Sequence, residues 1–304
     1  MDRIAVIANP IASQFTGGSH REVMAELAKD HEVEALWPAS ASESTRVARS
    51  AMDDGATVVV AMGGDGIVHH VAQALVGTDV ALGIIPAGTT NVAARLFGIP
   101  SRQLKAARLI GRARPALVGT ARLEMTRGDT NTVHYALFAC GLGLDAEVVR
   151  VADSDPYRKY RFGSLHYARS ALGVGLGRFP SVKPHVDLAA DGRRMKGTSA
   201  LIQFRDLYTY FGRISLRFDE APEPMSVLVM ERLKRRRVPA ISFAALFHRD
   251  LGRIGGFELW PGIDRLEFSA DPPVAVQADG EGLGLVDGGV VEWAPDSLNV
   301  LGAA

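Results

Sequence analysis

Cysteine and net charge are both scarce in this chain, and each shortage excludes a class of protein. Cys140 is the one cysteine among 304 residues, so an internal disulfide framework is excluded and a reducing compartment is expected. Its apolar neighbours predict a buried core thiol. The formal net charge is zero, which provides no overall field to attract nucleic acid. We therefore expect no nucleic-acid partner.

Long apolar runs are missing as well. No stretch has the length of a membrane-spanning helix, and the chain opens Met1-Asp2-Arg3-Ile4 without a charged and then apolar leader. These features predict a cytoplasmic protein, and any contact with the inner face of a membrane would be peripheral. The basic run at residues 232–237 is typical of a solvated face, but beside the apolar residues 241–247 it also suits an anionic membrane surface.

Residues 1–118 alternate apolar strands with helical patterns. A chain of 304 residues with 47% hydrophobic content is long enough for two domains. The alternation predicts a parallel sheet with helices on both faces, that is, a Rossmann-like α/β nucleotide-binding domain. The predicted strands are residues 4–8, 33–37, 58–62 and 80–85, and the predicted helices are residues 21–28, 44–52 and 104–111.

Two turns rich in small residues each follow a strand and open a helix. They are Gly63-Gly64-Asp65-Gly66 and Pro86-Ala87-Gly88-Thr89-Thr90-Asn91. Small residues would allow left-handed backbone angles and close approach to a ligand, and helix N-termini present N–H groups, so both turns predict phosphate binding. A carboxylate at Asp65 is unfavourable beside phosphate unless a cation bridges them, which predicts Mg²⁺ with ATP. The loop at Asn9 is expected at the same edge, because ligands bind beyond the carboxyl ends of parallel strands.

Residues 119–304 predict a β-rich second domain, because the segments become short, alternating and separated by turns. Asp191-Gly192 is a hairpin signal, and two helical patches are expected at residues 146–152 and 164–176. The last strand-like run, residues 289–293, could return to the first domain. The predicted strands are residues 121–126, 133–140, 182–190, 195–204, 225–230, 266–269 and 274–278.

Several motifs, in order along the chain, together resemble the diacylglycerol kinase catalytic family, which includes sphingosine kinases and bacterial lipid kinases. They are the Gly-Gly-Asp-Gly turn at 63–66, residues 83–91 with Ala94-Arg95, Gly141 to Ala146, Gly163 with Tyr167, and Gln277-Ala278-Asp279-Gly280-Glu281. The resemblance implies an N-terminal nucleotide-binding α/β domain and a C-terminal β-sandwich that binds a lipid. It further implies ATP-dependent phosphorylation of a lipid hydroxyl in the cleft between the two domains.

The resemblance also implies roles for individual residues. Glu281 would be the general base, and Asp65 would act in catalysis as the Mg²⁺ ligand. Neither the acceptor, which could be diacylglycerol-like or sphingoid, nor the oligomeric state can be read from the sequence. The residues that would hold ATP are Asn9, Gly63, Gly64, Asp65, Gly66, Thr89, Thr90, Asn91 and Asp279.

This chain also departs from the family pattern. Ile67 stands where threonine is usual, and His69 and His70 stand where asparagine and glutamate are usual. Adjacent histidines on a helix point about 100° apart, so a structural role is favoured over a two-ligand metal site. Residues 220–225 lack the Asp-Asp-Gly pattern that bacterial members link to a structural magnesium, and no second metal site is predicted.

Three other functions can be compared with the sequence. A non-catalytic nucleotide-binding protein of the same fold is the main alternative, since Ile67 and His70 remove a hydroxyl and a carboxylate from the phosphate loop. A dinucleotide-binding oxidoreductase would need a Gly-x-Gly-x-x-Gly turn after the first strand, which instead ends at Asn9-Pro10. A Walker-type site would need Gly-Lys-Ser or Gly-Lys-Thr, and neither occurs.

Overall fold

A computed structural model shows two compact units, which are described separately. Unit 1 comprises Met1–Thr120 with Ala294–Ala304, and unit 2 comprises Ala121–Trp293. The boundary predicted from the sequence, residue 118, lies two residues before this one, and the lipid and nucleotide roles of the two parts stay predictions. The structure describes residues 2–154, 169–177, 179–205, 208–211, 214–216, 224–241 and 255–302.

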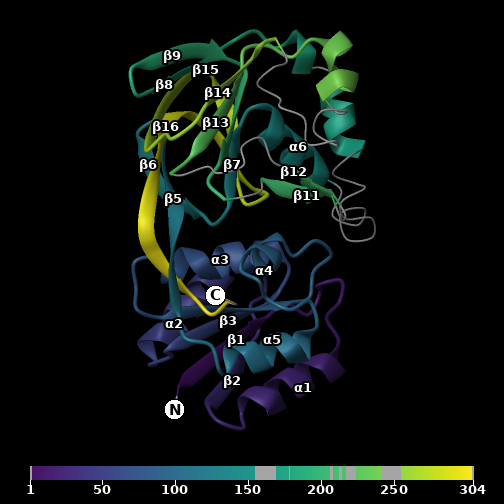
Figure 1. Cartoon of the computed structure of the whole chain (residues 1–304), viewed down its shortest axis with the longest axis vertical. Coiled ribbons are helices and arrows are strands. Elements are labelled where there is room, and N and C mark those ends of the chain that lie inside the picture. Colours follow the sequence, from purple (N-terminus) through teal and green to yellow (C-terminus); the bar gives the residue numbers. More distant parts are fainter. Residues whose placement is uncertain are drawn as a thin grey trace. The chain divides into compact units, whose positions relative to one another are not determined.

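Unit 1 contains a parallel sheet of strand order β2-β1-β3-β4 with helices on both faces (Figure 1). Helix α1 packs against α5, and α2 packs against α3. Right-handed crossovers place the two pairs on opposite faces, because the chain moves from β1 to β2 in one direction and from β2 to β3 in the other. The elements are β1 (Arg3–Ala8), α1 (Gly17–Leu27), β2 (Glu32–Leu36), α2 (Ser44–Asp53), β3 (Val58–Gly63), α3 (Asp65–Leu75), β4 (Ala81–Pro86), α4 (Val92–Leu96) and α5 (Gln103–Ile110).

The central strands of unit 1 are buried on both faces. All residues of β3 and β4 are buried, as are those of β1 from Ile4 onward. Strands covered on both faces read as continuous apolar runs, which is why the sequence located them within a residue or two. The last strand of the chain also reaches this sheet, where Val300 pairs in parallel with Leu82. An α/β fold for this part of the chain is therefore confirmed.

Unit 2 is rich in antiparallel strands, in the order β14-β13-β10-β7-β15-β16. Its core contains a large apolar cluster that includes Trp260, Leu266 and Ile202, and a smaller cluster that includes Phe179 and Leu233. Residues 169–176 are helical. The elements are β5 (Ala116–Arg127), β6 (Thr130–Ala136), β7 (Ala139–Leu142), α6 (Leu144–Asp153), η1 (Phe179–Ser181), β8 (Val186–Ala190), β9 (Arg193–Gly197), β10 (Ser199–Gln203), β11 (Thr209–Phe211), β12 (Ile214–Leu216), β13 (Ser226–Met230), η2 (Arg235–Arg237), β14 (Phe257–Trp260), β15 (Arg265–Ala278) and β16 (Glu281–Val300).

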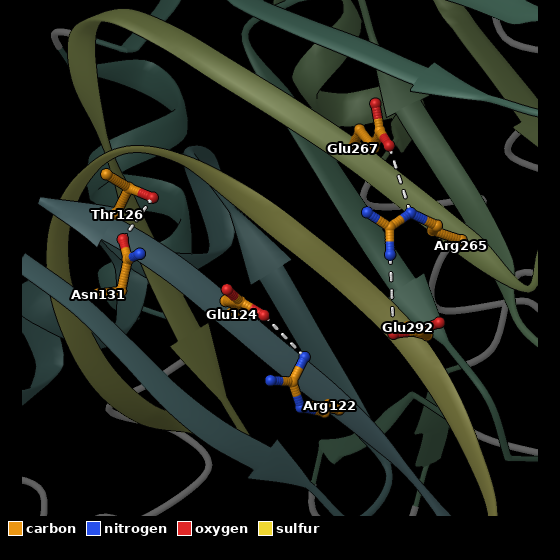
Figure 2. A network of polar contacts seen from close by, with 7 residues as sticks. All are labelled: Arg122, Glu124, Thr126, Asn131, Arg265, Glu267 and Glu292. Carbon is orange, nitrogen blue, oxygen red and sulfur yellow. Dashed lines mark hydrogen bonds and ion pairs between the residues drawn. The ribbon is translucent and has the colours of Figure 1, made fainter.

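Strand β5 of unit 2 alternates buried apolar residues with outward polar ones, whereas β7 and β13 are buried along their whole length. On β5, Ala121, Leu123 and Met125 are buried, and the residues between them face outward. Figure 2 shows the polar contacts made on β5, β6, β15 and β16. The pairs are Arg122 with Glu124 at 2.9 Å, Thr126 with Asn131 at 3.0 Å, Arg265 with Glu267 at 3.2 Å, and Arg265 with Glu292 at 3.7 Å.

Several strand predictions for unit 2 were wrong in detail. Residues 133–140 form two strands, β6 and β7, because the backbone amides of Leu137 and Phe138 bond to the Asp279 carboxylate. Residues 195–204 also form two strands, β9 and β10. The predicted strands at 266–269 and 274–278 are instead one strand, β15, which has a register shift between Ser269 and Val274.

Two further expectations concern local structure. Asp191 and Gly192 have φ of 47° and 76°, as a tight hairpin requires, and they join β8 to β9, so this turn is confirmed. The helical patch predicted at 164–176 is helical over 169–176, and its first residues lie outside the described residues. Among the helices that the structure describes, none combines the length and apolar character needed to cross a membrane.

We predict that Gly289→Ala destabilises unit 2. A Cβ at Gly289 would lie 2.2 Å from the Glu124 carbonyl oxygen and 3.1 Å from Met125 Cα, so the backbone of β5 would have to move. Overpacking of this kind costs about 1–3 kcal/mol. Gly173→Ala is the matched control, because a Cβ there meets no atom within 4 Å and alanine favours the helix. Urea unfolding followed by circular dichroism should show a lower midpoint for Gly289→Ala alone, and equal midpoints would contradict the prediction.

Candidate phosphate loops and the Asp-Gly-Glu turn

Three loops of unit 1 meet at the carboxyl edge of its parallel sheet. The Asn9 N–H donates to the Met62 carbonyl at 2.9 Å, which joins the ends of β1 and β3. The Ala87 N–H donates to the Gly63 carbonyl at 2.8 Å, and the Gln14 N–H donates to the Ala87 carbonyl at 2.8 Å. The expected convergence of the loops after β1, β3 and β4 is therefore confirmed.

The glycines of these loops do not adopt left-handed geometry. Gly63, Gly64, Gly66 and Gly88 all lie outside the left-handed region, so that part of the expectation was wrong, while close approach to a ligand stays a prediction. A Cβ on Gly88 would lie only 2.6 Å from Gly64 Cα, and a Cβ on Gly63 would lie 2.6 Å from Ile67 Cγ2. The loops after β3 and β4 thus touch backbone to backbone, in a contact that a larger residue at position 88 would prevent.

The left-handed residue at this edge is Asn91, with φ of 50° and ψ of 54°. Its side chain closes the loop onto Gly88. Asn91 Oδ1 accepts the Gly88 N–H at 2.9 Å, and Nδ2 donates to the Gly88 carbonyl at 2.8 Å. Asn91 is therefore the N-cap residue of α4 by position, but its side chain does not cap that helix.

Asp65 supplies the hydrogen bond that Asn91 does not. Its Oδ1 accepts the Ala93 N–H in the first turn of α4 at 3.0 Å. A capping acceptor of this kind is worth about 1 kcal/mol, so Asp65 has a structural role in addition to its predicted catalytic one. The sequence could not show this contact, because 28 residues separate the two partners.

The N-terminus of α3 has the features of an anion site. Its N-cap is Gly64, which has no side chain to bond the first amides of the helix. Asp65 lies in the first turn, where a carboxylate complements the helix dipole. Thr89 lies exposed on the neighbouring loop, with its hydroxyl 3.1 Å from the Ser13 hydroxyl.

The residues that depart from the family pattern pack within α3. Ile67 is buried against Gly63, and His69 is buried. The rings of His69 and His70 are 5.3 Å apart and nearly perpendicular. The structural role expected for the two histidines stays a prediction. Among the described residues, no group of three or more histidine, cysteine, aspartate or glutamate side chains is placed to hold a metal ion.

The second candidate site is the hairpin turn between β15 and β16 in unit 2. Asp279 and Gly280 have φ of 53° and 85°, and Ala278 pairs with Glu281 across them. Two left-handed residues between paired strands define a type I′ turn, for which Asp-Gly is a preferred sequence. Glu281 is the first residue of β16 and is partly exposed.

Asp279 anchors this turn from inside. It is 4% exposed, and its Oδ1 accepts the Phe138 N–H at 3.0 Å while Oδ2 accepts the Leu137 N–H at 2.8 Å. The Asp279 N–H donates to the Ala139 carbonyl at 2.9 Å. These bonds make Asp279 a structural residue of the turn, and its predicted contact with ATP stays a prediction.

A buried polar network beside the turn was missed by the sequence analysis. The Asp145 carboxylate on α6 accepts hydrogen bonds from the Tyr208 hydroxyl and, at 2.6 Å, from Gln277 Nε2. Burial raises the pKa of Asp145, and these two hydrogen bonds oppose the rise. The pKa of Tyr208 is raised well above its usual value. Burial is the largest cause, and the negative charge of Asp145 is the second. Gly141 leaves room for this network, because a Cβ there would lie 2.6 Å from Asp145 Oδ2.

Some of the residues singled out in the sequence lie outside the described residues. They are Gly163, Tyr167, most of the segment 220–225, and all but the first residue of the apolar segment 241–247. Cys140 is described, and it is buried as expected. Burial is the main cause that raises its pKa well above the usual value, and it behaves as a core thiol.

Comparison with known proteins identifies the first part of the chain. The family model described as "Diacylglycerol kinase catalytic domain" matches residues 3–121. A diacylglycerol kinase of Mycobacterium tuberculosis (strain ATCC 25618 / H37Rv) is 33% identical over 107 residues, which are 34% of this chain and 35% of that protein. A diacylglycerol kinase of Bacillus subtilis (strain 168) is 29% identical over 205 residues, which are 65% of this chain and 62% of that protein. The chain therefore spans less than two thirds of either relative.

A solved structure extends the likeness in fold to the whole chain. It is described as a candidate diacylglycerol kinase from Bacillus anthracis str. Sterne, and it matches with a TM-score of 0.74 at 19% identity, covering 99% of this chain and 95% of that one. At this identity the likeness concerns the fold alone. With the family match in sequence, residues 3–121 of this chain belong to the diacylglycerol kinase catalytic domain family.

Proposed function

We propose that this protein is an ATP- and Mg²⁺-dependent lipid kinase that transfers the γ-phosphate of ATP to a lipid hydroxyl. The acceptor would be diacylglycerol-like or sphingoid. The observation that carries the proposal is the backbone contact of Gly64 with Gly88, which brings two loops of a diacylglycerol kinase catalytic domain together at the carboxyl edge of the sheet. Phosphoryl transfer depends mostly on positioning and charge neutralisation, which such loops supply.

The residues at this edge of the sheet fit a nucleoside triphosphate. The uncapped N-terminus of α3 would bind phosphate through its first amides, and Asn9, Thr89, Thr90 and Asn91 lie on the adjoining loops. Asp65 would hold Mg²⁺ together with phosphate oxygens and water, as is usual for this ion. A carboxylate has several lone pairs, so the bond from the Ala93 N–H does not prevent coordination. Bound Mg²⁺ would neutralise charge on the phosphates.

Glu281 is the proposed general base, which would take the proton from the acceptor hydroxyl. The turn that carries it is tied down by Asp279, so the backbone of Glu281 is held in one place. A non-catalytic nucleotide-binding protein is the alternative function. It would keep the ATP site in unit 1 and lack the transfer step.

A peripheral membrane contact is also proposed, because an acceptor lipid resides in a bilayer. Leu172 and Leu176 are 48% and 50% exposed and lie one turn apart on the helix at 169–176. Arg235 in the exposed basic segment donates to the Gly177 carbonyl at 3.0 Å, which places positive charge beside this helix. Exposed leucines next to arginines suit an anionic bilayer surface.

The test of the proposed function is transfer of radiolabel from γ-labelled ATP to lipids. Diacylglycerol, sphingosine and phosphatidylglycerol are presented in mixed micelles with Mg²⁺, and products are separated by chromatography. A labelled lipid supports the kinase. Tight ATP binding without transfer to any lipid of a total extract supports the alternative, and the absence of ATP binding contradicts both.

We predict that Gly88→Ala weakens Mg-ATP binding by about tenfold, or 1.4 kcal/mol. The added Cβ would lie 2.6 Å from Gly64 Cα and 2.9 Å from Asn91 Oδ1, so the two loops must separate. Gly17→Ala in the same unit is the control, since its Cβ would meet no atom within 4 Å. Calorimetry measures both affinities. Wild-type affinity in a folded Gly88→Ala protein would show that the loop contact is not part of the nucleotide site.

Asp65→Asn should abolish phosphoryl transfer while the fold remains intact. The asparagine oxygen can still accept the Ala93 N–H, so the cap of α4 is kept and only the charge is lost. We expect turnover to fall by about a hundredfold or more, as for other lost preorganised electrostatic contacts. Asp65→Ala, which loses the cap as well, should in addition lower the melting temperature. Near-normal turnover in Asp65→Asn would remove this carboxylate from the mechanism.

Glu281→Gln should separate catalysis from nucleotide binding. A general base acts on the acceptor, so we expect turnover to fall by roughly a hundred- to ten-thousandfold, with Mg-ATP affinity nearly unchanged. Both quantities are measured on the same preparation, after circular dichroism has shown that the variant is folded. Turnover at the wild-type rate would mean that another group takes the proton.

A further inference from the structure

The side chain of Gln277 joins the turn that carries Glu281 to the helix that carries Asp145. Gln277 is 3% exposed and is the penultimate residue of β15. Its Nε2 donates to Asp145 Oδ2 at 2.6 Å and to the Tyr208 hydroxyl oxygen at 3.1 Å. Its Oε1 accepts the Gly280 N–H at 2.8 Å. The side-chain amide therefore uses both of its donors and its acceptor oxygen within the protein.

The chemistry of its neighbours leaves this amide one orientation. The Gly280 N–H can only donate, so the amide oxygen must face Gly280 and the NH₂ group must face Asp145. Tyr208 reinforces the arrangement, because its hydroxyl donates to Asp145 while its oxygen accepts from Gln277. A buried network in which each of these side chains bonds the other two is rigid.

The network acts where the strand ladder is interrupted. Val276 pairs with Gly284, Gln277 pairs with Gly282, and a register shift separates the two pairs. An irregular ladder defines the backbone less firmly than a regular one. The bond from the Gly280 N–H to Gln277 therefore fixes the backbone immediately before Glu281. The bonds of the Asp279 carboxylate fix the preceding residue of the turn.

We infer that Gln277 is a positioning residue for phosphoryl transfer: its amide holds Gly280, and through Gly280 the backbone of Glu281, while Asp145 and Tyr208 hold the amide. This inference rests on the proposed role of Glu281 as general base. A displacement of about 1 Å at a reacting group can cost a hundredfold in rate, so a residue that fixes the turn contributes to turnover without touching the acceptor.

The test is a double-mutant cycle between positions 277 and 281. Gln277→Leu keeps the volume of the side chain and removes both ends of the bridge. We expect kcat to fall by about ten- to a hundredfold with the KM for Mg-ATP within about twofold of wild type. In the Glu281→Gln background the same change should cost less than about threefold, because the base that Gln277 positions is already gone.

Two further variants separate positioning from general stability. Thr198→Val is the matched control, since it removes a different buried hydrogen bond of unit 2, to the Met230 carbonyl, and should leave kcat unchanged. Tyr208→Phe removes the hydroxyl that holds Asp145 and should lower kcat in the same way as Gln277→Leu, but less. Hydrogen exchange of the Gly280 amide should accelerate in Gln277→Leu and not in Thr198→Val.

Each outcome has a separate meaning. If the fold-losses in kcat of the two single mutants multiply in the double mutant, the positioning role is overturned. An unchanged kcat in Gln277→Leu, with an active wild type, overturns it as well. Both results leave the proposed function standing. If Gln277→Leu does not fold, an unchanged kcat in Tyr208→Phe overturns it in the same way. A wild-type protein that phosphorylates no lipid overturns the proposed function, and this inference with it.

Discussion

Backbone amides that neither a helix nor a sheet satisfies are the constraint on which both candidate sites depend. A buried amide left without a partner costs about 1–3 kcal/mol, so the fold must supply an acceptor for each one. In unit 1 the acceptors are side chains of Asp65 and Asn91, and in unit 2 they are side chains of Asp279 and Gln277. The polar residues that a functional argument selects are therefore the same residues that hold the loops in shape.

This double use changes what a substitution means. Removing the Asp65 or Asp279 carboxylate altogether deletes a charge and also leaves backbone N–H groups without their hydrogen-bond acceptor. Loss of activity would then have two causes. An amide side chain keeps an acceptor of nearly the same shape, which makes the Asp→Asn change the informative one wherever a carboxylate bonds backbone N–H groups. At Asp279 the replacement is less complete, since both carboxylate oxygens accept bonds and asparagine has only one such oxygen.

What the sequence could predict depended on how local each feature is. The strands of unit 1 were located closely because each is apolar on both faces, and the meeting of the loops at Asn9, Gly63 and Ala87 followed from the parallel strands themselves. The break between β6 and β7 was out of reach, because the carboxylate that causes it lies 142 residues away from Leu137. The bridge from Gln277 to Asp145 spans 132 residues and was missed for the same reason.

The glycines of the two turns are small for different reasons. The Ile67 methyl group occupies the position that a Cβ on Gly63 would need, so packing alone explains that glycine. Gly64 and Gly88 differ, because what each one meets is the backbone of the other. A contact between two backbones buries little apolar area, so the hydrophobic effect does not explain why Gly64 and Gly88 lie so close together. The pair at 64 and 88 therefore argues for a ligand more strongly than the three glycines of the first turn taken together.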